Sequence, residues 1–225
     1  MPPETKTSAK SITVKELLKF RGKVLGLKVA AGTRNLSRKI TVSEINRPGL
    51  AIAGHLEQFR SERIQIIGAG EYAFCVKEEC KKVRASLTRM FAYSDTPAVI
   101  VTGGLKPLPS IREACRKAGI PLLVTGLDTS SFIRELTIFL DDKLAAITYV
   151  HGVLVSVYGL GVLIQGDSGV GKSECALELL KRGHILIADD VVEIKRRIGY
   201  MLVGNSPKYI KHYMEVRGLG IIDVE

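Results

Sequence analysis

Gly166-Asp167-Ser168-Gly169-Val170-Gly171-Lys172-Ser173 is the stretch that decides the fold of the second half of this chain. It matches the phosphate-binding loop pattern G-x-x-x-x-G-K-[ST] at every fixed position. The apolar run 162–164 before it predicts a strand, and residues 174–182 after it have the apolar spacing of a helix. A strand, a glycine-rich turn and a helix start let backbone N–H groups converge on phosphate oxygens. We therefore expect this loop to bind a nucleotide, with Lys172 on the β- and γ-phosphates and Ser173 on Mg²⁺.

A tight antiparallel hairpin is expected to lead into this loop. Residues 151–158 have the composition of one strand, and Gly159-Leu160-Gly161 then turns the chain into the strand before the loop. A short turn that contains glycine, between two such runs, predicts a hairpin. Gly183 is expected to end the helix after the loop, because Lys181-Arg182 suit the negative end of a helix.

Two aspartates follow the next expected strand. Residues 185–188 are apolar and end at Asp189-Asp190. A carboxylate at the end of such a strand, beside a phosphate loop, reaches Mg²⁺ or the water bound to it. One carboxylate is enough for the metal, so the second is a candidate base toward an acceptor hydroxyl. Spacing alone does not say which aspartate takes which role.

A third candidate segment is 214–223, in which two glycines flank a leucine before an apolar strand. Glu215 and Arg217 stand two apart, and residues two apart in an extended segment point to one face. A carboxylate for a metal and a guanidinium for a phosphate could thus share one site. By spacing alone, His151 is typical of packing, and Glu174 simply complements the helix dipole.

The first half of the chain predicts a separate α/β domain. Thr13 and Glu16 form a capping box at a helix start. Beyond them, strands alternate with helices in an order that implies right-handed crossovers and a small parallel sheet. The expected strands are 65–68, 98–102 and 122–124, with a weaker strand at 39–44, and the expected helices are 78–93 and 109–118. We find no catalytic constellation there. A helix at 129–140 is the expected connector, with the first domain spanning residues 1–140 and the phosphate-loop domain beginning near Asp141.

Composition narrows the class of protein. The 225 residues are 46% hydrophobic, with a mean hydropathy of +0.15, which is typical of a globular chain. No run is long enough to cross a membrane, and the N-terminus lacks the apolar core of a signal peptide, so we expect a cytoplasmic protein. The cysteines form no C-x-x-C pair, which argues against zinc and against a disulfide framework; they are Cys75, Cys80, Cys115 and Cys175. We expect Cys175 to pack in the core or against a neighbouring helix.

The net charge of +10 is unevenly distributed. Residues 1–140 carry 23 Lys and Arg against 12 Asp and Glu, whereas residues 141–225 carry 10 against 11. The basic excess therefore belongs to the first half and not to the phosphate loop. No base-reading motif accompanies it, so a solvated basic surface is favoured over binding of nucleic acid.

With these motifs in place, the chain resembles the HPr kinase/phosphorylase family. The resemblance is carried by residues 151–155, 166–174, 187–190 and 214–224, and the last segment matches the family signature. It implies a bifunctional enzyme that phosphorylates one serine of the phosphocarrier protein HPr with ATP or pyrophosphate. The same enzyme removes the group by phosphorolysis, regulates bacterial carbon metabolism and assembles as a homohexamer. The resemblance also implies a kinase domain similar to that of phosphoenolpyruvate carboxykinases.

The resemblance assigns roles to individual residues. It implies that the phosphate loop binds the nucleotide, that Lys172 contacts the phosphates, and that Ser173 and Glu215 hold Mg²⁺. His151 and Asp190 become active-site residues, with Asp190 as proton acceptor in the forward direction and proton donor in reverse. The candidate catalytic set is then completed by Asp189 and Arg217. The family's kinase domain continues beyond the position of Glu225, so we expect this chain to be truncated at its C-terminus.

Two alternatives remain open at this point. A small-molecule phosphotransferase related to the carboxykinases would share the fold but not the protein substrate. A nucleotide-dependent binding module would use the loop without phosphotransfer; a guanine-specific switch of that kind should carry an Asn-Lys-x-Asp segment, which this sequence lacks.

Overall fold

The computed structural model describes residues 11–77, 81–92, 95–197, 201–207, 213–216 and 220–223. By its internal contacts the chain divides into two units, one spanning Ala9–Leu144 and one beginning at Ala145. Each unit is described by itself. The domain boundary expected near Asp141 stays a prediction.

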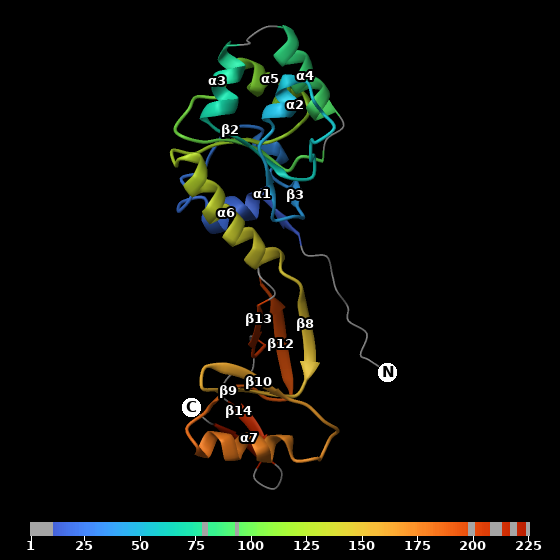
Figure 1. Cartoon of the computed structure of the whole chain (residues 1–225), viewed down its shortest axis with the longest axis vertical. Helices are drawn as coiled ribbons and strands as arrows, with labels where there is room; N and C mark the ends of the chain where they lie inside the picture. Colours follow the sequence, from blue (N-terminus) through green and yellow to red (C-terminus); the bar gives the residue numbers. More distant parts are fainter. Residues whose placement is uncertain are drawn as a thin grey trace. The chain divides into compact units, whose positions relative to one another are not determined.

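The N-terminal unit is built on a five-stranded mixed sheet (Figure 1). The strands lie in the order β2 (Lys28–Ala31), β7 (Leu122–Val124), β6 (Val99–Val101), β5 (Ile64–Ile67) and β4 (Ile45–Asn46). β4 to β7 run parallel, whereas β2 pairs antiparallel with β7 at the edge. The expected parallel sheet is confirmed. Of the strand expected at 39–44, only Lys39–Ile40 is confirmed, as the short β3 paired with β1 (Ile12–Thr13); the next strand is β4, at 45–46.

Helices cover both faces of this sheet. The first, α1 (Val14–Arg21), begins with the predicted capping box: the Thr13 hydroxyl accepts from the Glu16 N–H at 3.2 Å, and the Glu16 carboxylate accepts from the Thr13 N–H at 2.8 Å. The others are the short η1 (Thr33–Asn35) and α2 (Gly49–Ala53), then α3 (Ala69–Lys77), α4 (Lys81–Ala92), α5 (Pro109–Lys117) and α6 (Thr129–Leu144). Helices at the expected positions of α4, α5 and α6 are confirmed, and α3 is an addition to the prediction.

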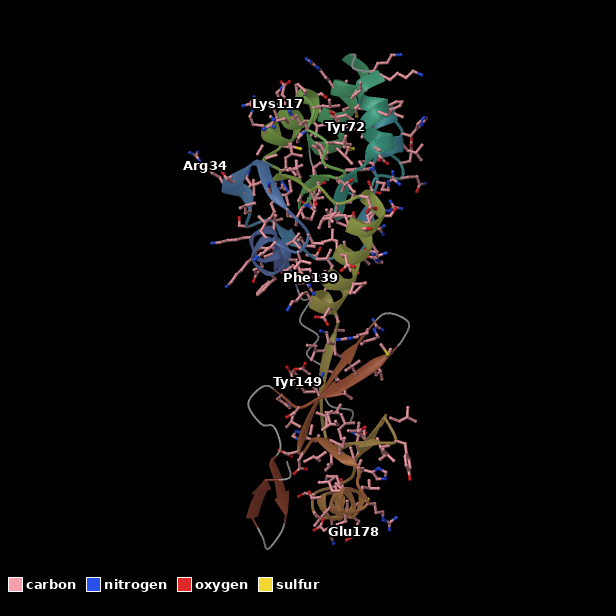
Figure 2. All side chains as sticks on the ribbon, turned by 90° about the vertical axis from the view of Figure 1, so that its left-hand side faces the viewer. Arg34, Tyr72, Lys117, Phe139, Tyr149 and Glu178 are labelled. Carbon is pink, nitrogen blue, oxygen red and sulfur yellow. The ribbon has the colours of Figure 1, made fainter. Side chains whose placement is uncertain are left out.

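Side chains of the central strands point alternately into two hydrophobic cores, one on each face of the sheet. Ile66 and Ile100 face α1 and α6, together with Leu17, Leu123, Phe132 and Leu136. Ile67 and Val101 face α4 and α5, together with Val99, Leu87, Phe91, Ile111 and Cys115. This double burial explains the continuous apolar runs in the sequence. Figure 2 shows Phe139 on α6 and Lys117 on α5, and the Arg21 guanidinium lies 5.3 Å from the centre of the Phe139 ring.

The second unit consists of antiparallel strands around one described helix. β10 (Leu160–Ile164), β9 (Val153–Val157) and β11 (Ile185–Ala188) form one sheet, and β13 (Leu202–Asn205), β12 (Val191–Arg196) and β8 (Ile147–His151) form a second. β14 (Tyr213–Val216) pairs with β15 (Gly220–Asp223), and the helix α7 spans Lys172–Lys181. Both parts of the chain are therefore α/β, as predicted.

The entry to the phosphate loop is a hairpin, as expected. β9 and β10 pair antiparallel from Val153 opposite Ile164 to Val157 opposite Leu160. The two residues between them, Tyr158 and Gly159, have φ of +51° and +84°, the left-handed values that a two-residue hairpin turn requires. The single strand expected over 151–158 is wrong, however: it breaks at Gly152 into β8 and β9, which belong to different sheets.

Candidate functional site

The predicted phosphate loop connects β10 to α7. The helix begins at Lys172, two residues earlier than the sequence indicated. Gly169 and Gly171 take left-handed φ values of +88° and +97°, which glycine adopts readily. No described side chain caps the helix at Gly171. The first N–H groups of α7 therefore keep their capacity to bind an anion.

Lys172 lies over its own loop. Its Nζ donates to the carbonyl oxygens of Gly166 at 2.9 Å and Asp167 at 2.8 Å. These two bonds hold the ammonium group at the loop, where the oxygens of a bound phosphate chain would lie. The phosphate-contacting role of Lys172 stays a prediction.

The two aspartates occupy a strained turn between β11 and β12. The N–H of Val191 donates to the carbonyl of Asp189 at 2.8 Å, which closes a three-residue turn around Asp190. Asp190 has a φ of +65°, the value of a γ-turn, which is an uncommon and strained conformation for a residue with a side chain. Gly152 N–H donates to the carbonyl of Asp190 at 3.1 Å and so helps to hold this turn. Strained backbone of this kind is common at functional sites.

His151 stands beside Asp190. The Nδ1 of His151 and the Oδ1 of Asp190 are 3.7 Å apart, so the two form an ion pair when the imidazole is protonated. Both side chains are largely exposed, at 85% and 86%. Their closeness follows from the pairing of β8 with β12, in which His151 lies opposite Val191, the residue after Asp190. Further along the same pair of strands, the hydroxyl of Tyr149, which Figure 2 labels, donates to the Glu193 carboxylate at 3.1 Å. The packing role that spacing alone favoured for His151 is therefore wrong.

A pocket of about 300 Å³ joins the loop to the aspartates. Its lining is Val153, Ser168, Gly169, Gly171, Lys172, Ser173, Glu174, Asp189 and Asp190. This volume lies at the lower end of the range of small-molecule sites. Three loop residues, Gly166, Asp167 and Val170, lie in the loop but outside this lining. The structure thus brings together four predicted chemical groups: those of Lys172, Ser173, Asp189 and Asp190.

Three residues around the pocket were missed or misjudged from sequence. Glu174 lines the pocket, although its position in the first turn of the helix indicated only a dipole effect. Gly152 contacts the Asp190 turn, and a glycine inside a strand pattern was the available signal for such a close approach. Cys175 is exposed rather than packed, because the packed face of α7 is formed by Ala176, Leu179 and Leu180 and Cys175 lies off that face.

The third candidate segment is placed only in part. Glu215 lies in β14, opposite Ile221 of β15, and β14 contacts α7. Arg217 lies outside the described residues. Within the described ranges, no group of three His, Cys, Asp or Glu residues forms a metal site. The pairing of Ser173 with Glu215 around Mg²⁺ therefore stays a prediction.

Comparison with known proteins gives the family. The model of the HPr serine kinase N terminus matches residues 12–140, and the model of the HPr serine kinase C-terminal domain matches residues 142–225. The chain belongs to the HPr serine kinase family. The resemblance inferred from the four motifs is thus confirmed. A curated HPr kinase/phosphorylase of Levilactobacillus brevis is 46% identical over 214 residues, which are 95% of this chain and 67% of that protein.

Two solved structures are also similar. The HPr(Ser) kinase/phosphatase from Coxiella burnetii is 39% identical over 34% of this chain and 51% of that chain, with a TM-score of 0.33. The CBS and DRTGG domains of the regulatory region of a Clostridium perfringens pyrophosphatase, complexed with the activator diadenosine tetraphosphate, are 17% identical. That match covers 53% of this chain and 45% of the other, with a TM-score of 0.38. This family member therefore spans about two thirds of the curated relative and about half of the solved kinase.

Among the residues that the structure describes, no helix is both long and apolar enough to span a bilayer.

Proposed function

We propose that this family member phosphorylates a serine of the phosphocarrier protein HPr with ATP or pyrophosphate, and removes that phosphate by phosphorolysis. The observation that carries the proposal is the single pocket that joins Lys172 and Ser173 of the phosphate loop to Asp189 and Asp190. The family match adds the protein substrate, because the curated relative is named an HPr kinase/phosphorylase. It favours an enzyme over a non-catalytic nucleotide-binding module and over a small-molecule phosphotransferase.

The loop side of the pocket binds the phosphate donor. Backbone N–H groups at the start of α7 and the ammonium of Lys172 would hold the phosphate oxygens. The pocket presents the hydroxyl of Ser173 and the aspartate carboxylates, and such hard oxygen ligands suit Mg²⁺. Ser173 with Glu215 is the proposed pair of ligands. When bound, Mg²⁺ neutralises charge on the transferring phosphoryl group.

Asp190 handles the proton in both directions. In the kinase direction the serine oxygen of HPr attacks the terminal phosphorus, the bond to the leaving group breaks, which is ADP from ATP or phosphate from pyrophosphate, and the serine proton passes to the Asp190 carboxylate. In the reverse direction an oxygen of inorganic phosphate attacks phosphoserine. The serine oxygen leaves with a proton from Asp190, and pyrophosphate forms. Because phosphorolysis is the reverse of phosphorylation by pyrophosphate, these two reactions cross one transition state, and one residue serves as acceptor and donor. His151, 3.7 Å from Asp190, would orient this carboxylate, and Arg217 would bind a phosphate oxygen.

Finer features follow from the family and remain part of the proposal. These are a homohexameric assembly, a cytoplasmic location, and a kinase domain related to that of phosphoenolpyruvate carboxykinases. The antiparallel hairpin that enters the loop supports the last of these. No nucleic-acid or membrane partner is proposed.

The test is Asp190→Asn in the full-length protein, with Glu178→Gln as the matched control on the exposed side of α7 (Figure 2). We expect Asp190→Asn to lower both the kinase and the phosphorylase rate about 100-fold or more, the usual effect of losing an acid–base group. ATP affinity should stay within about threefold of wild type, since the loop is untouched. Lys172→Ala should instead weaken ATP binding itself.

Both rates and the ATP dissociation constant are measured on one preparation, with HPr and with small phosphate acceptors as substrates. Loss of only one activity, or loss that follows ATP affinity alone, would refute the shared acid–base role. Turnover of a small acceptor without turnover of HPr would refute the protein substrate.

A further inference from the structure

Gly152 is the one residue between β8 and β9, which belong to the two three-stranded sheets of the second unit. On one side of it, β9 pairs with the phosphate-loop strand β10 up to its last residue, Ile164. On the other side, His151 of β8 pairs with the first residue of β12, directly after Asp190. We propose that Gly152 is a positioning residue that fixes the Asp190 turn against the phosphate loop. This inference rests on the proposed function, because it concerns the geometry of the same site.

The segment His151-Gly152 is hydrogen-bonded both to the Asp190 turn and to the residue before the phosphate loop. The Gly152 N–H donates to the carbonyl of Asp190 at 3.1 Å. On the loop side, Nε2 of Gln165 donates to the carbonyl of His151 at 3.4 Å, and Gln165 directly precedes the phosphate loop. The segment His151-Gly152 therefore bonds to the candidate base Asp190 through Gly152 and to the residue before the phosphate loop through His151.

Only glycine fits at this position. Its φ is +155°, and a Cβ built there would lie 2.6 Å from the carbonyl oxygen of Ile164. It would also lie 3.3 Å from both Leu163 Cδ1 and Gln165 Cγ. The Ile164 oxygen belongs to the backbone of a paired strand, so it cannot turn aside as a flexible side chain would. Any side chain at residue 152 must therefore push residue 152, and with it the Asp190 turn to which it is bonded, away from the end of β10.

That displacement acts on catalysis more than on nucleotide binding. His151 and Asp190 both belong to the elements that Gly152 joins to the loop, so they move with the turn. The loop keeps its own contacts, which are the two carbonyl bonds of Lys172 and the start of α7. A misplacement of about 1 Å in a reacting group can cost about 100-fold in rate. The expected signature is thus a fall in kcat at nearly constant ATP affinity.

The experiment compares Gly152→Ala with two control variants in the same unit, Gly159→Ala and Gly183→Ala. Both control glycines have left-handed φ values, +84° and +86°, and a Cβ at either would meet nothing within 4 Å. The controls therefore report the cost of adding a Cβ at a glycine of positive φ without the contact with Ile164. We measure kcat and KM in both directions, the ATP dissociation constant, Tm, and amide hydrogen exchange at residues 189–192.

Gly152→Ala is expected to lower kcat about 100-fold in both directions while KM and Kd for ATP stay within about threefold. It should also speed exchange at residues 189–192, and the controls should do neither. If kcat stays within about twofold of wild type, or if ATP affinity falls as much as kcat, the positioning role is wrong.

A second variant keeps the inference testable if Gly152→Ala does not fold. Gln165→Met removes the amide donor to His151 while it keeps the length of the side chain. Loss of one such hydrogen bond should lower kcat about three- to tenfold, with little change in Tm. An unchanged kcat in Gln165→Met, together with failure of Gly152→Ala to fold, overturns the proposal.

The exchange measurement separates this inference from the proposed function. If wild-type protein does not phosphorylate HPr, the proposed function fails. Faster exchange at residues 189–192 in Gly152→Ala, but not in Gly183→Ala, would then still support the structural link. Unchanged exchange in a folded Gly152→Ala variant would overturn the link whatever the activity.

Discussion

Burial changes the chemistry of two thiols in the N-terminal unit. On α5, burial raises the pKa of Cys115 to about 12 from its ordinary value of 9.0. On α3, burial and then the carboxylate of Glu71 raise the pKa of Cys75 to about 11. Cys175 on α7 is exposed. Desolvation favours the neutral thiol, so the folded unit keeps protons that the unfolded chain releases in alkali.

This difference predicts an alkaline loss of stability. Each raised pKa contributes stability that is fully present below pH 9 and is lost as the pH rises toward the folded-state value. A single thiol can contribute at most about 1.4 kcal/mol per pH unit in that window. We therefore expect Cys115→Ala to flatten the decline of the unfolding free energy between pH 9 and pH 11, measured by urea denaturation. Cys175→Ala is the control and should leave the slope unchanged; parallel curves for wild type and Cys115→Ala would contradict the prediction.

The candidate site shows which residues a sequence can reveal. Lys172 and Ser173 were predicted from sequence because the fixed positions of the loop pattern are residue types that phosphate chemistry requires. The left-handed φ of Asp190 was not, because it arises from the turn between β11 and β12 and from the Gly152 hydrogen bond. Neither local residue type nor spacing carries that information.

Among the elements, α3 owes its position to one carboxylate. Glu71, in the first turn, is 9% exposed, accepts from the Gly68 N–H at 3.1 Å, and takes two 3.0 Å bonds from the guanidinium of Arg47. It thereby satisfies a donor at the helix start and ties α3 to the segment after β4. The sequence did not indicate this helix, because its Ala-Gly start and weak periodicity lack a helix signal.

Glu71→Ala should therefore destabilise the N-terminal unit by about 1–3 kcal/mol, the cost of leaving a buried polar partner unsatisfied. Glu113→Ala on α5 is the control, since its pair with Lys117 is exposed and such pairs contribute little. Urea unfolding of both variants gives the comparison. Equal midpoints for the two would show that Glu71 does not hold α3.

Prediction at the level of elements was best where a segment is buried on both sides. β5, β6 and β7 were recognised because apolar runs in a central parallel strand have few alternatives. The edge strand β2 was not, because its side chains are exposed or half-buried and make no apolar run or strict alternation. The break between β8 and β9 was also missed, because it depends on the close approach of Gly152 to Ile164.

At the scale of the whole molecule, the buried apolar side chains are divided unequally between the two units. Both large cores belong to residues 9–144, and they fill the two faces of one sheet. In the described part of the second unit, each hydrophobic cluster contains three buried residues. Every residue of the proposed catalytic site also belongs to that second unit. The unit that carries the larger cores is thus separate from the unit that carries the proposed chemistry.

This division predicts that residues 9–144 fold when expressed alone. Their sheet has helices on both faces, so the fragment should unfold in a single cooperative transition with urea. It should keep the alkaline sensitivity that Cys115 confers, because that thiol is buried within the same core.

MgATP should not stabilise the fragment, whereas it should stabilise the whole chain, by about 2.7 kcal/mol at one hundred times its Kd. Circular dichroism and thermal unfolding, with and without MgATP, measure both effects. A fragment that stays unfolded would show that its two cores depend on residues outside 9–144, and stabilisation of the fragment by MgATP would place a nucleotide site outside the phosphate loop.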